Sequence, residues 1–226
     1  MTTGMQIFLD DGTDVQIDDK FFNLALSGKY QVSCSPSFGG PSGSLTISGK
    51  SPIVAFSGGY AGVHSISQSG SNFTFYFTVA SAVTLTVYVF DVPTSIGNFG
   101  LQIFNDDEEL TFDSSRLYLK IVKDISFSSY ASIQNVPQPV PVPGRAYAIL
   151  MSQFIGYKFG RPFTPGESGP DFFEVEVNTA LCSIDSSNLY LSEFLTFRSQ
   201  TGLGIQQAWE YEAFAGQIQI IDVTYF

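Results

Sequence analysis

Two neighbouring stretches of the chain alternate between apolar and polar residues over lengths typical of β-strands. In the first, Phe73, Phe75, Phe77 and Val79 alternate with Thr74, Tyr76 and Thr78. The second stretch, from Val83 to Val89, again places an apolar residue at every other position after a short turn at Ser81. A period of two predicts strands that turn one face towards a core, as each sheet of a β-sandwich does.

The composition agrees with this prediction. Charged residues make up only 14% of the 226 residues, against an average of about 25%, and aromatic residues reach 15%. Aromatic and β-branched side chains pack well on a pleated sheet, whereas long helices would need more Ala, Glu, Lys and Leu. We therefore expect an all-β protein, an antiparallel, jelly-roll-like β-sandwich of two β units, with less than about a tenth of its residues in helices.

A hairpin pattern occurs twice, at residues 5–19 (MQIFLDDGTDVQIDD) and 101–115 (LQIFNDDEELTFDSS). Each copy has a short apolar strand, an acidic turn and a returning strand, so we predict two β-hairpins. Residues Phe8, Ile17, Phe104 and Phe112 are expected to be buried, with a cost of about 3–5 kcal/mol for truncating each of them. The turn residues Asp10, Asp11, Asp106 and Asp107 are expected to lie in solvent or at a subunit contact.

Residues 135–144 (NVPQPVPVPG) carry a proline at every second position. Proline lacks a backbone donor and fixes φ, which excludes a helix or a central strand. Two interpretations stay open: a stiff extended connector, or an extended segment along one sheet edge. As a connector it would divide the chain into an N-terminal β-sandwich at 1–134 and a C-terminal β unit at 145–226.

Other strands are predicted on both sides of this segment. Residues 116–122 (RLYLKIV) alternate as one more strand, and the alternation near Ile220 shifts phase, which predicts a bulge there. The stretch 204–214 (GIQQAWEYEAF) fits a short helix or a strand equally well.

The net charge of −11 excludes several classes of partner. An acidic surface repels nucleic-acid phosphates and anionic membranes, so we expect neither nucleic-acid binding nor membrane insertion. The stretch from Val79 to Val92 is too short and too polar to span a bilayer, and the start of the sequence lacks the features of a secretory signal. We expect a soluble protein made in a cytoplasm, with Cys34 and Cys182 as unpaired thiols.

Residues for chemistry are scarce. His64 has no nucleophile elbow to serve, and one His with two Cys matches no zinc pattern. The acidic turns do not follow the spacing of a calcium-binding loop. We therefore expect no catalytic, cofactor-binding or metal-binding residues and no cofactor, with His64 as a surface or packed residue.

Trp209 and Tyr211, in the stretch AWEYEAF, are the candidate contacts for a glycan or a protein partner. Their aromatic rings could stack on a sugar, while Glu210 and Glu212 could accept hydrogen bonds from its hydroxyls. The alternative is that both rings pack in the core, as most aromatic side chains do.

The stretches VYVFDVP and GNFGLQIFNDDEELTFDSSRLYLKIV carry a family resemblance over Val87 to Val122. This pattern resembles tailed-bacteriophage and prophage proteins of the minor tail or tail-fibre-associated kind, whose activity is unassigned. The resemblance implies a non-catalytic structural protein of the virion tail, made in the host bacterial cytoplasm and binding other tail proteins. It also implies a homo-oligomer.

Three alternatives stay open beside this one. The first is a receptor-binding module of the tail that binds host surface polysaccharide, and the second is a decoration protein of the capsid or collar. The third is a hydrolase of capsule or cell wall, which would require paired carboxylates in a cleft.

Overall fold

The computed structural model of the chain describes the backbone of residues 7–8, 15–17, 22–37, 41–94, 100–127, 137–151, 156–163, 172–202, 209–213 and 216–226. Side chains are described over 22–37, 41–94, 100–126, 137–151, 180–192 and 216–226, and at Gly160. These stretches form strands and turns without any helix, so no helix in them could cross a membrane.

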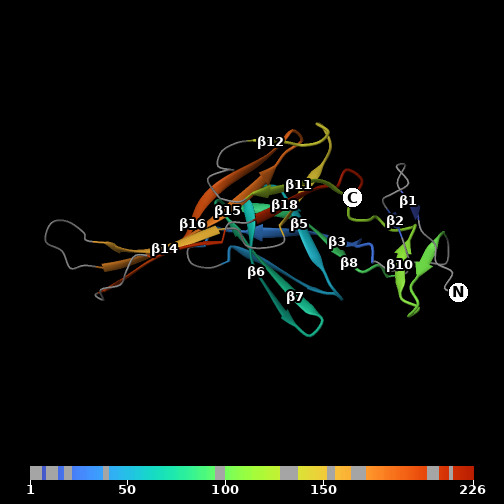
Figure 1. The fold of residues 1–226 in the computed structure, drawn as a ribbon, viewed down its shortest axis with the longest axis horizontal. Coiled ribbons are helices and arrows are strands. Elements are labelled where there is room, and N and C mark those ends of the chain that lie inside the picture. The colour runs from blue at the N-terminus through green and yellow to red at the C-terminus, as the bar shows by residue number, and fades with distance from the viewer. Residues whose placement is uncertain are drawn as a thin grey trace.

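Most of the described strands belong to two large antiparallel sheets (Figure 1). The six-stranded sheet contains, in spatial order, β11 (Ile121–Phe127), β18 (Gly216–Asp222), β13 (Tyr147–Met151), β5 (Ile53–Ser57), β8 (Val83–Asp91) and β3 (Ala25–Cys34). The eight-stranded sheet follows the path β12 (Gln138–Pro139), β16 (Asn188–Gly202), β15 (Phe172–Ile184), β6 (Ala61–Ser69), β7 (Asn72–Val79) and β4 (Gly43–Ser48). Off this path, β14 (Gly156–Phe163) pairs with β15 and with β17 (Trp209–Ala213). The predicted all-β antiparallel sandwich is confirmed.

The main core lies between these sheets. The two alternating runs contribute to it as predicted, with Phe75, Phe77, Val79, Leu85, Val87 and Val89 buried and Phe73 partly buried beside them. Phe56 of the six-stranded sheet meets Phe77 of the eight-stranded sheet edge to face, with ring centroids 6.2 Å apart. Cys34 and Cys182 lie in the same core as free, buried thiols, which confirms their predicted unpaired state.

The six-stranded sheet is also covered on its other face. A second cluster there contains Ala55, Tyr88, Phe90, Ala148, Leu150, Ile221 and Val223. Leu26 of β3 packs against it, as do Leu24, Leu119 and Phe226 from the segments that flank the sheet. All five residues of β13 are therefore buried, because each face of this strand meets an apolar layer.

The second cluster corrects the predicted bulge near Ile220. Ile218 and Ile220 face the main core while Ile221 faces the second cluster, so regular alternation accounts for the apparent change of phase. The pairing of β18 with β13 has no register shift, and the bulge lies instead in β11, between Ile121 and Lys123. The predicted strand at 116–122 is also corrected, since Tyr118 forms only an isolated bridge to Ala25 before β11 begins.

Both predicted hairpins are present. β1 (Ile7–Phe8) pairs with β2 (Val15–Ile17), and β9 (Gln102–Phe104) pairs with β10 (Leu110–Asp113). The side chains of Phe8, Ile17, Asp10 and Asp11 lie outside the described residues. In the second hairpin Asp106 and Asp107 are exposed, as predicted.

The predicted burial of Phe104 is wrong. Its side chain is 49% exposed, and Phe112 is only partly buried, stacked on Tyr118 with ring centroids 4.9 Å apart. Ile103, Thr111 and Asp113 face inward instead. A register shift between Leu110 and Phe112 accompanies this arrangement, and the Thr111 hydroxyl donates a hydrogen bond to the Ile103 carbonyl at 3.0 Å. The apolar residues of so short a hairpin therefore do not decide which face turns inward.

The proline-rich segment follows the sheet-edge alternative along part of its length. Gln138 and Pro139 pair with β16 at the edge of the eight-stranded sheet, where a missing proline donor costs no ladder bond. The Val140 and Gly144 amides donate to the Ser187 and Ser186 carbonyls. The segment is thereby attached to the turn between β15 and β16.

The strands on either side of residues 135–144 share both large sheets. β13 pairs with β5, β18 pairs with β11, and β15 pairs with β6 at Cys182 and Ala61. The division into an N-terminal β-sandwich at 1–134 and a C-terminal β unit at 145–226 stays a prediction, and the described strands of the two parts do not form separate sheets.

Candidate functional site

A pocket of about 380 Å³ lies where the hairpin β9–β10 meets the end of the sandwich. Its polar walls are contributed by the turn before β5, the end of β8 and the hairpin, and its apolar wall includes Leu26, Pro93 and Leu110. Four charged side chains line it: Lys50, Asp91, Glu109 and Arg116. What the pocket can do depends on whether these charges are free.

Asp91 holds the turn before β5 against the end of β8. One of its carboxylate oxygens accepts hydrogen bonds from the Ser51 and Val92 amides, each at 2.8 Å, and the other accepts from the Lys50 amide at 2.9 Å. The side chain is buried, so three backbone donors compensate for the loss of its hydration. Gly49 leaves room for this carboxylate, because a Cβ at that position would lie 2.3 Å from its oxygen.

Lys50 and Glu109 connect the sandwich to the hairpin. The Lys50 ammonium lies 2.5 Å from a Glu109 carboxylate oxygen and 5.0 Å from the centre of the Phe22 ring. The hydrogen bond from Lys50, followed by one from the Asn105 amide, lowers the pKa of Glu109. Both side chains of the ion pair are about half exposed, so the pair contributes little to the free energy of unfolding.

Arg116 is occupied in the same way. Its guanidinium donates to the backbone carbonyl and to the hydroxyl of Thr94. The four charges of the pocket therefore have partners within the chain, and neither His64 nor either cysteine is among the lining residues. The pocket is therefore a contact region between the end of the sandwich and the hairpin β9–β10, in which the charged side chains are already paired.

The turn of the hairpin depends on a residue that the sequence analysis did not identify. The side-chain oxygen of Asn105 accepts hydrogen bonds from the Asp107 and Glu109 amides, at 3.1 and 2.8 Å. Glu108 has a φ of 62°, in the left-handed region that few residues other than Gly and Asn adopt. An Asn just before an acidic run is a turn signal that could have identified this loop.

Asp113 closes the other end of the hairpin. One of its carboxylate oxygens accepts from the Ser115 amide and hydroxyl, and the other accepts from the Gln102 side chain at 2.9 Å. The Tyr118 hydroxyl donates to the Asp113 carbonyl at 3.0 Å and also accepts from the Asp113 amide. The Asp-Ser-Ser sequence that ends the hairpin pattern therefore forms a hydrogen-bond network at the base of the hairpin.

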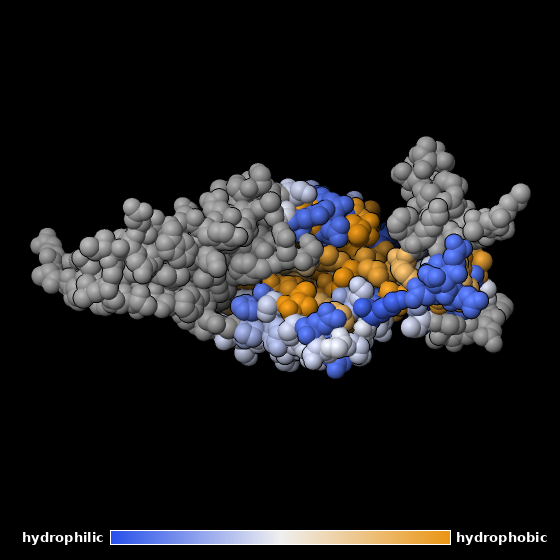
Figure 2. All heavy atoms as spheres, turned by 60° about the horizontal axis from the view of Figure 1, so that its bottom comes forward, coloured by the Kyte–Doolittle hydropathy of each residue, from blue (hydrophilic) through white to orange (hydrophobic). Residues whose placement is uncertain are grey.

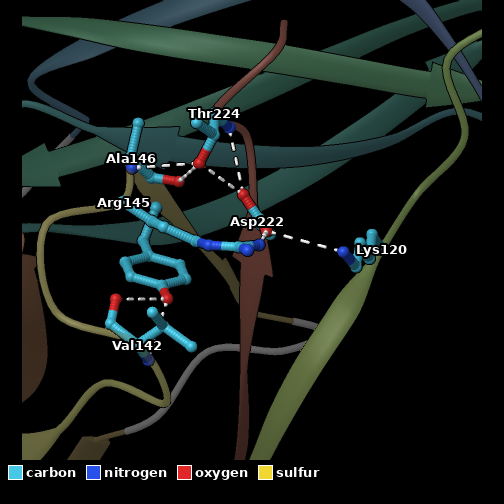
Figure 3. A network of polar contacts seen from close by, with 7 residues as sticks. Lys120, Val142, Arg145, Ala146, Asp222 and Thr224 are labelled. Atoms are coloured by element: carbon cyan, nitrogen blue, oxygen red, sulfur yellow. Dashed lines mark hydrogen bonds and ion pairs between the residues drawn. The ribbon is translucent and has the colours of Figure 1, made fainter.

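A second polar network surrounds Asp222 at the end of β18 (Figure 3). Its carboxylate accepts from the Arg145 guanidinium at 2.6 Å and from the Thr224 hydroxyl at 2.6 Å, and the Lys120 ammonium lies 3.6 Å away. Burial opposes ionisation, but the hydrogen bonds from Thr224 and the nearby Arg145 outweigh it and lower the pKa of Asp222 to about 2. Arg145 and Asp222 are 77 positions apart, so no local pattern indicates the pair.

The candidate residues for chemistry occupy structural positions. His64 lies at a bulge between β6 and β7, and its Nδ1 is 3.2 Å from the hydroxyl of the buried Thr78. Burial raises the pKa of Cys34 and raises that of Cys182 to about 12, so neither thiol is poised to form a nucleophilic thiolate. The described residues contain no cluster of His, Cys, Asp and Glu that could hold a metal ion.

Trp209 and Tyr211 lie in β17, which resolves the open choice between helix and strand for this part of the stretch. β17 pairs with β14, with Trp209 opposite Gly160 and Tyr211 opposite Lys158. Their side chains lie outside the described residues, so their predicted role in binding a glycan or a partner stays a prediction.

Comparison with known proteins found no match: no protein-family model, no curated protein and no solved structure matches the chain. Its function must therefore be argued from its own residues.

Proposed function

We propose that the chain is a non-catalytic structural component of a phage virion, at the tail tip or associated with a tail fibre, that acts through contacts with other tail proteins. The segment that carries the resemblance, Val87 to Val122, comprises the end of β8, the hairpin β9–β10 and the start of β11. The proposal rests on the resemblance and on what this segment exposes.

The observation that carries the proposal is the exposed apolar surface of the hairpin region. Leu101, Phe104 and Leu117 are 40, 49 and 44% exposed. Surfaces that bind another protein typically expose apolar side chains. At the opposite end of the molecule, β14 projects beyond the sandwich (Figure 1), so the chain is elongated, with the hairpin at one tip.

The pocket between the sandwich and the hairpin supports the non-catalytic part of the proposal. Asp91 bonds the turn before β5, Arg116 bonds Thr94, and Lys50 pairs with Glu109 of the hairpin, so each charged group of the pocket already has a partner within the chain. Hydrogen bonds at the turn and at the base of the hairpin limit its conformational freedom, which reduces the entropy lost on assembly.

Particles produced by a host that carries the gene provide the test. Mass spectrometry should detect the chain at fixed stoichiometry, and antibody labelling in electron microscopy should place it at the tail. In a strain that lacks the gene, wild-type protein and Tyr225→Ser should restore complete particles, whereas Phe104→Ser should fold but fail to incorporate. Tyr225 is the control because it is 81% exposed and lies outside the hairpin. Absence of the chain from purified particles would refute the proposal, and labelling of the head or collar would favour a decoration protein.

A glycan-binding receptor module is the second candidate. β17 lies at the margin of the eight-stranded sheet, and Trp209 and Tyr211 are two positions apart in it. Aromatic residues suit stacking on a polysaccharide. The isolated protein should then bind host surface polysaccharide and lose that binding on Trp209→Ala.

A further inference from the structure

The strand β4 forms one end of the eight-stranded sheet. It pairs with β7 from Gly43 opposite Phe77 to Ser48 opposite Asn72, with no register shift. Among the described strands no other pairs with it. A regular, six-residue strand is thus open to hydrogen bonding along one side.

This edge carries none of the usual protection against strand addition. Soluble proteins protect open edges with charged side chains, prolines or bulges. The β4 sequence GSLTIS contains no charged residue and no proline, and residues 30–90 as a whole contain one residue of the Asp, Glu, Lys and Arg types, Lys50. In Figure 2 the surface that β6 and β7 bring forward is accordingly mostly pale, in contrast to the deep blue of the hairpin end.

The pairing with β7 determines which backbone groups face the open side. The Gly49 amide donates to the Ser71 carbonyl, so positions 49 and 71 form a hydrogen-bonded pair of the ladder. The hairpin between β6 and β7 agrees, because Ser69 and Asn72 close a two-residue loop and point their backbone groups at each other. In an antiparallel ladder these pairs alternate, so the amides and carbonyls of Ser44, Thr46 and Ser48 point away from β7.

The residues of β4 are self-complementary about Thr46. If a second copy pairs antiparallel with Thr46 opposite Thr46, then Ser44 meets Ser48, and Leu45 meets Ile47. Hydroxyls then lie opposite hydroxyls on the outer face, where the Thr46 and Thr74 hydroxyls already lie 2.9 Å apart. The partly buried Leu45 gains an apolar neighbour on the core face. The three outward-pointing residues would form about six main-chain hydrogen bonds, two for each hydrogen-bonded pair.

Electrostatics restricts where two copies can meet. Each copy has a net charge of −11, so most approaches bring like charges together. Residues 30–90, which contain β4, carry no acidic residue and only one basic residue, Lys50, so this repulsion is weak there. A partner with the same uncharged edge, which a second copy supplies, fits it without desolvating a charge.

We propose that two copies of this chain form a two-fold dimer in which their β4 strands pair antiparallel about Thr46 and join the eight-stranded sheets into one continuous sheet. The two-fold axis makes each copy contribute the same residues, as closed symmetric dimers do. The inference does not depend on the virion assignment, since it concerns the isolated chain.

Sedimentation of the purified full-length protein tests the dimer. Between about 1 and about 100 μM, a range in which small interfaces dissociate, the mass should rise from that of one 24.6 kDa chain towards that of two. Thr46→Lys places two like charges at the axis and should leave a monomer at every concentration. Ser67→Lys is the matched control, because Ser67 pairs with Thr74 in the same cross-strand row as Thr46 but lies two strands away from the open side of β4, and this variant should still dimerise.

A crosslink provides the second readout, which does not require that a lysine be tolerated. Thr46→Cys should give a disulfide-linked dimer under an added mild oxidant, because directly opposed residues lie within disulfide range, whereas Ser67→Cys should not. The native thiols are buried and should stay unreacted. A wild-type protein that is monomeric across the range, a Thr46→Lys variant that still dimerises, or a Thr46→Cys variant that crosslinks no better than Ser67→Cys would each overturn the proposal.

Discussion

The six-stranded sheet and the hairpin β9–β10 hold their side chains in different ways. In the sheet, strands such as β13 have apolar side chains buried on both faces, and the surrounding layers are apolar. In the hairpin, Thr111 and Asp113 are fully buried while Phe104 is half exposed. The sheet is held by removal of apolar area from water, and the hairpin is held by hydrogen bonds at its base and turn.

This difference shows what alternation along a strand does and does not determine. A period of two separates the residues of a strand into two sets, but which set turns inward depends on what the rest of the fold places against it. In the second half of β8, from Val87 to Asp91, both choices lead to burial. In the hairpin the inward-facing residues include Thr111 and Asp113, whose polar groups form hydrogen bonds there, and Phe104 lies on the exposed face.

The largest expected effect lies in the sandwich core. Phe77→Ala removes a fully buried ring that packs on Phe56, and it should lower the free energy of unfolding by about 3–5 kcal/mol. Urea unfolding followed by circular dichroism measures this loss. Tyr225→Ala, at an 81% exposed side chain, is the control and should change stability by less than about 0.5 kcal/mol. A loss below about 1 kcal/mol for Phe77→Ala would contradict the assignment of the main core.

The next effect is dependent on pH and comes from Asp222. Its pKa of about 2 in the folded chain lies below the ordinary 3.8, so its ionised form stabilises the fold above about pH 4. As the pH falls from about 4 to about 2 the carboxylate is protonated and this contribution, about 2 kcal/mol, is lost. Asp222→Asn should therefore destabilise the protein at pH 7, with a difference from wild type that shrinks at pH 2.

Unfolding free energies measured across this pH range test the prediction, with Asp106→Asn in the exposed hairpin turn as the control. If the Asp222→Asn difference stayed constant with pH, the network in Figure 3 would stabilise the fold through packing alone.

Much of the fold could be predicted from the sequence because its signals are local. The alternation of β7 and β8 and the acidic turns of the two hairpins each lie within about ten residues, the range over which strand and turn preferences act. The alternation alone predicted that Phe77 and Leu85 face the core, and both are buried. The proline-rich segment was correctly limited to a connector or an edge, since both follow from the missing donor.

The rest depends on contacts between distant parts of the chain. Asp91 accepts from the Lys50 amide 41 positions away, and Arg145 meets Asp222 across 77 positions, so no window of sequence contains either pair. The exposure of Phe104 could not be predicted for the same reason, because it depends on what lies against the opposite face of the hairpin. The sites proposed from local patterns, at Trp209 and Tyr211, lie where side chains are not described.

A smaller effect on stability is expected from the hydrogen bonds of Tyr118 at the base of the hairpin. Tyr118→Phe keeps the ring stacked on Phe112 but removes the hydroxyl that bonds to both the amide and the carbonyl of Asp113. The loss should be about 1 kcal/mol, the usual net value of a hydrogen bond. Amide hydrogen exchange should rise at the hairpin more than in the sheets, which separates local opening from global destabilisation. An unchanged exchange rate at Asp113 would show that the hydroxyl does not hold the hairpin.

The smallest effect on folding is expected at the residue whose burial was predicted wrongly. Phe104→Ala should change the free energy of unfolding by less than about 1 kcal/mol, because half of its surface is already in water. The adjacent Ile103, 6% exposed on the other face of the same strand, is the matched control, and Ile103→Ala should cost about 2–4 kcal/mol. The opposite ranking would mean that the hairpin turns its other face inward. The expected ranking leaves Phe104 available for a partner, so a Phe104 variant that folds normally but fails to assemble would assign this side chain to intermolecular contact.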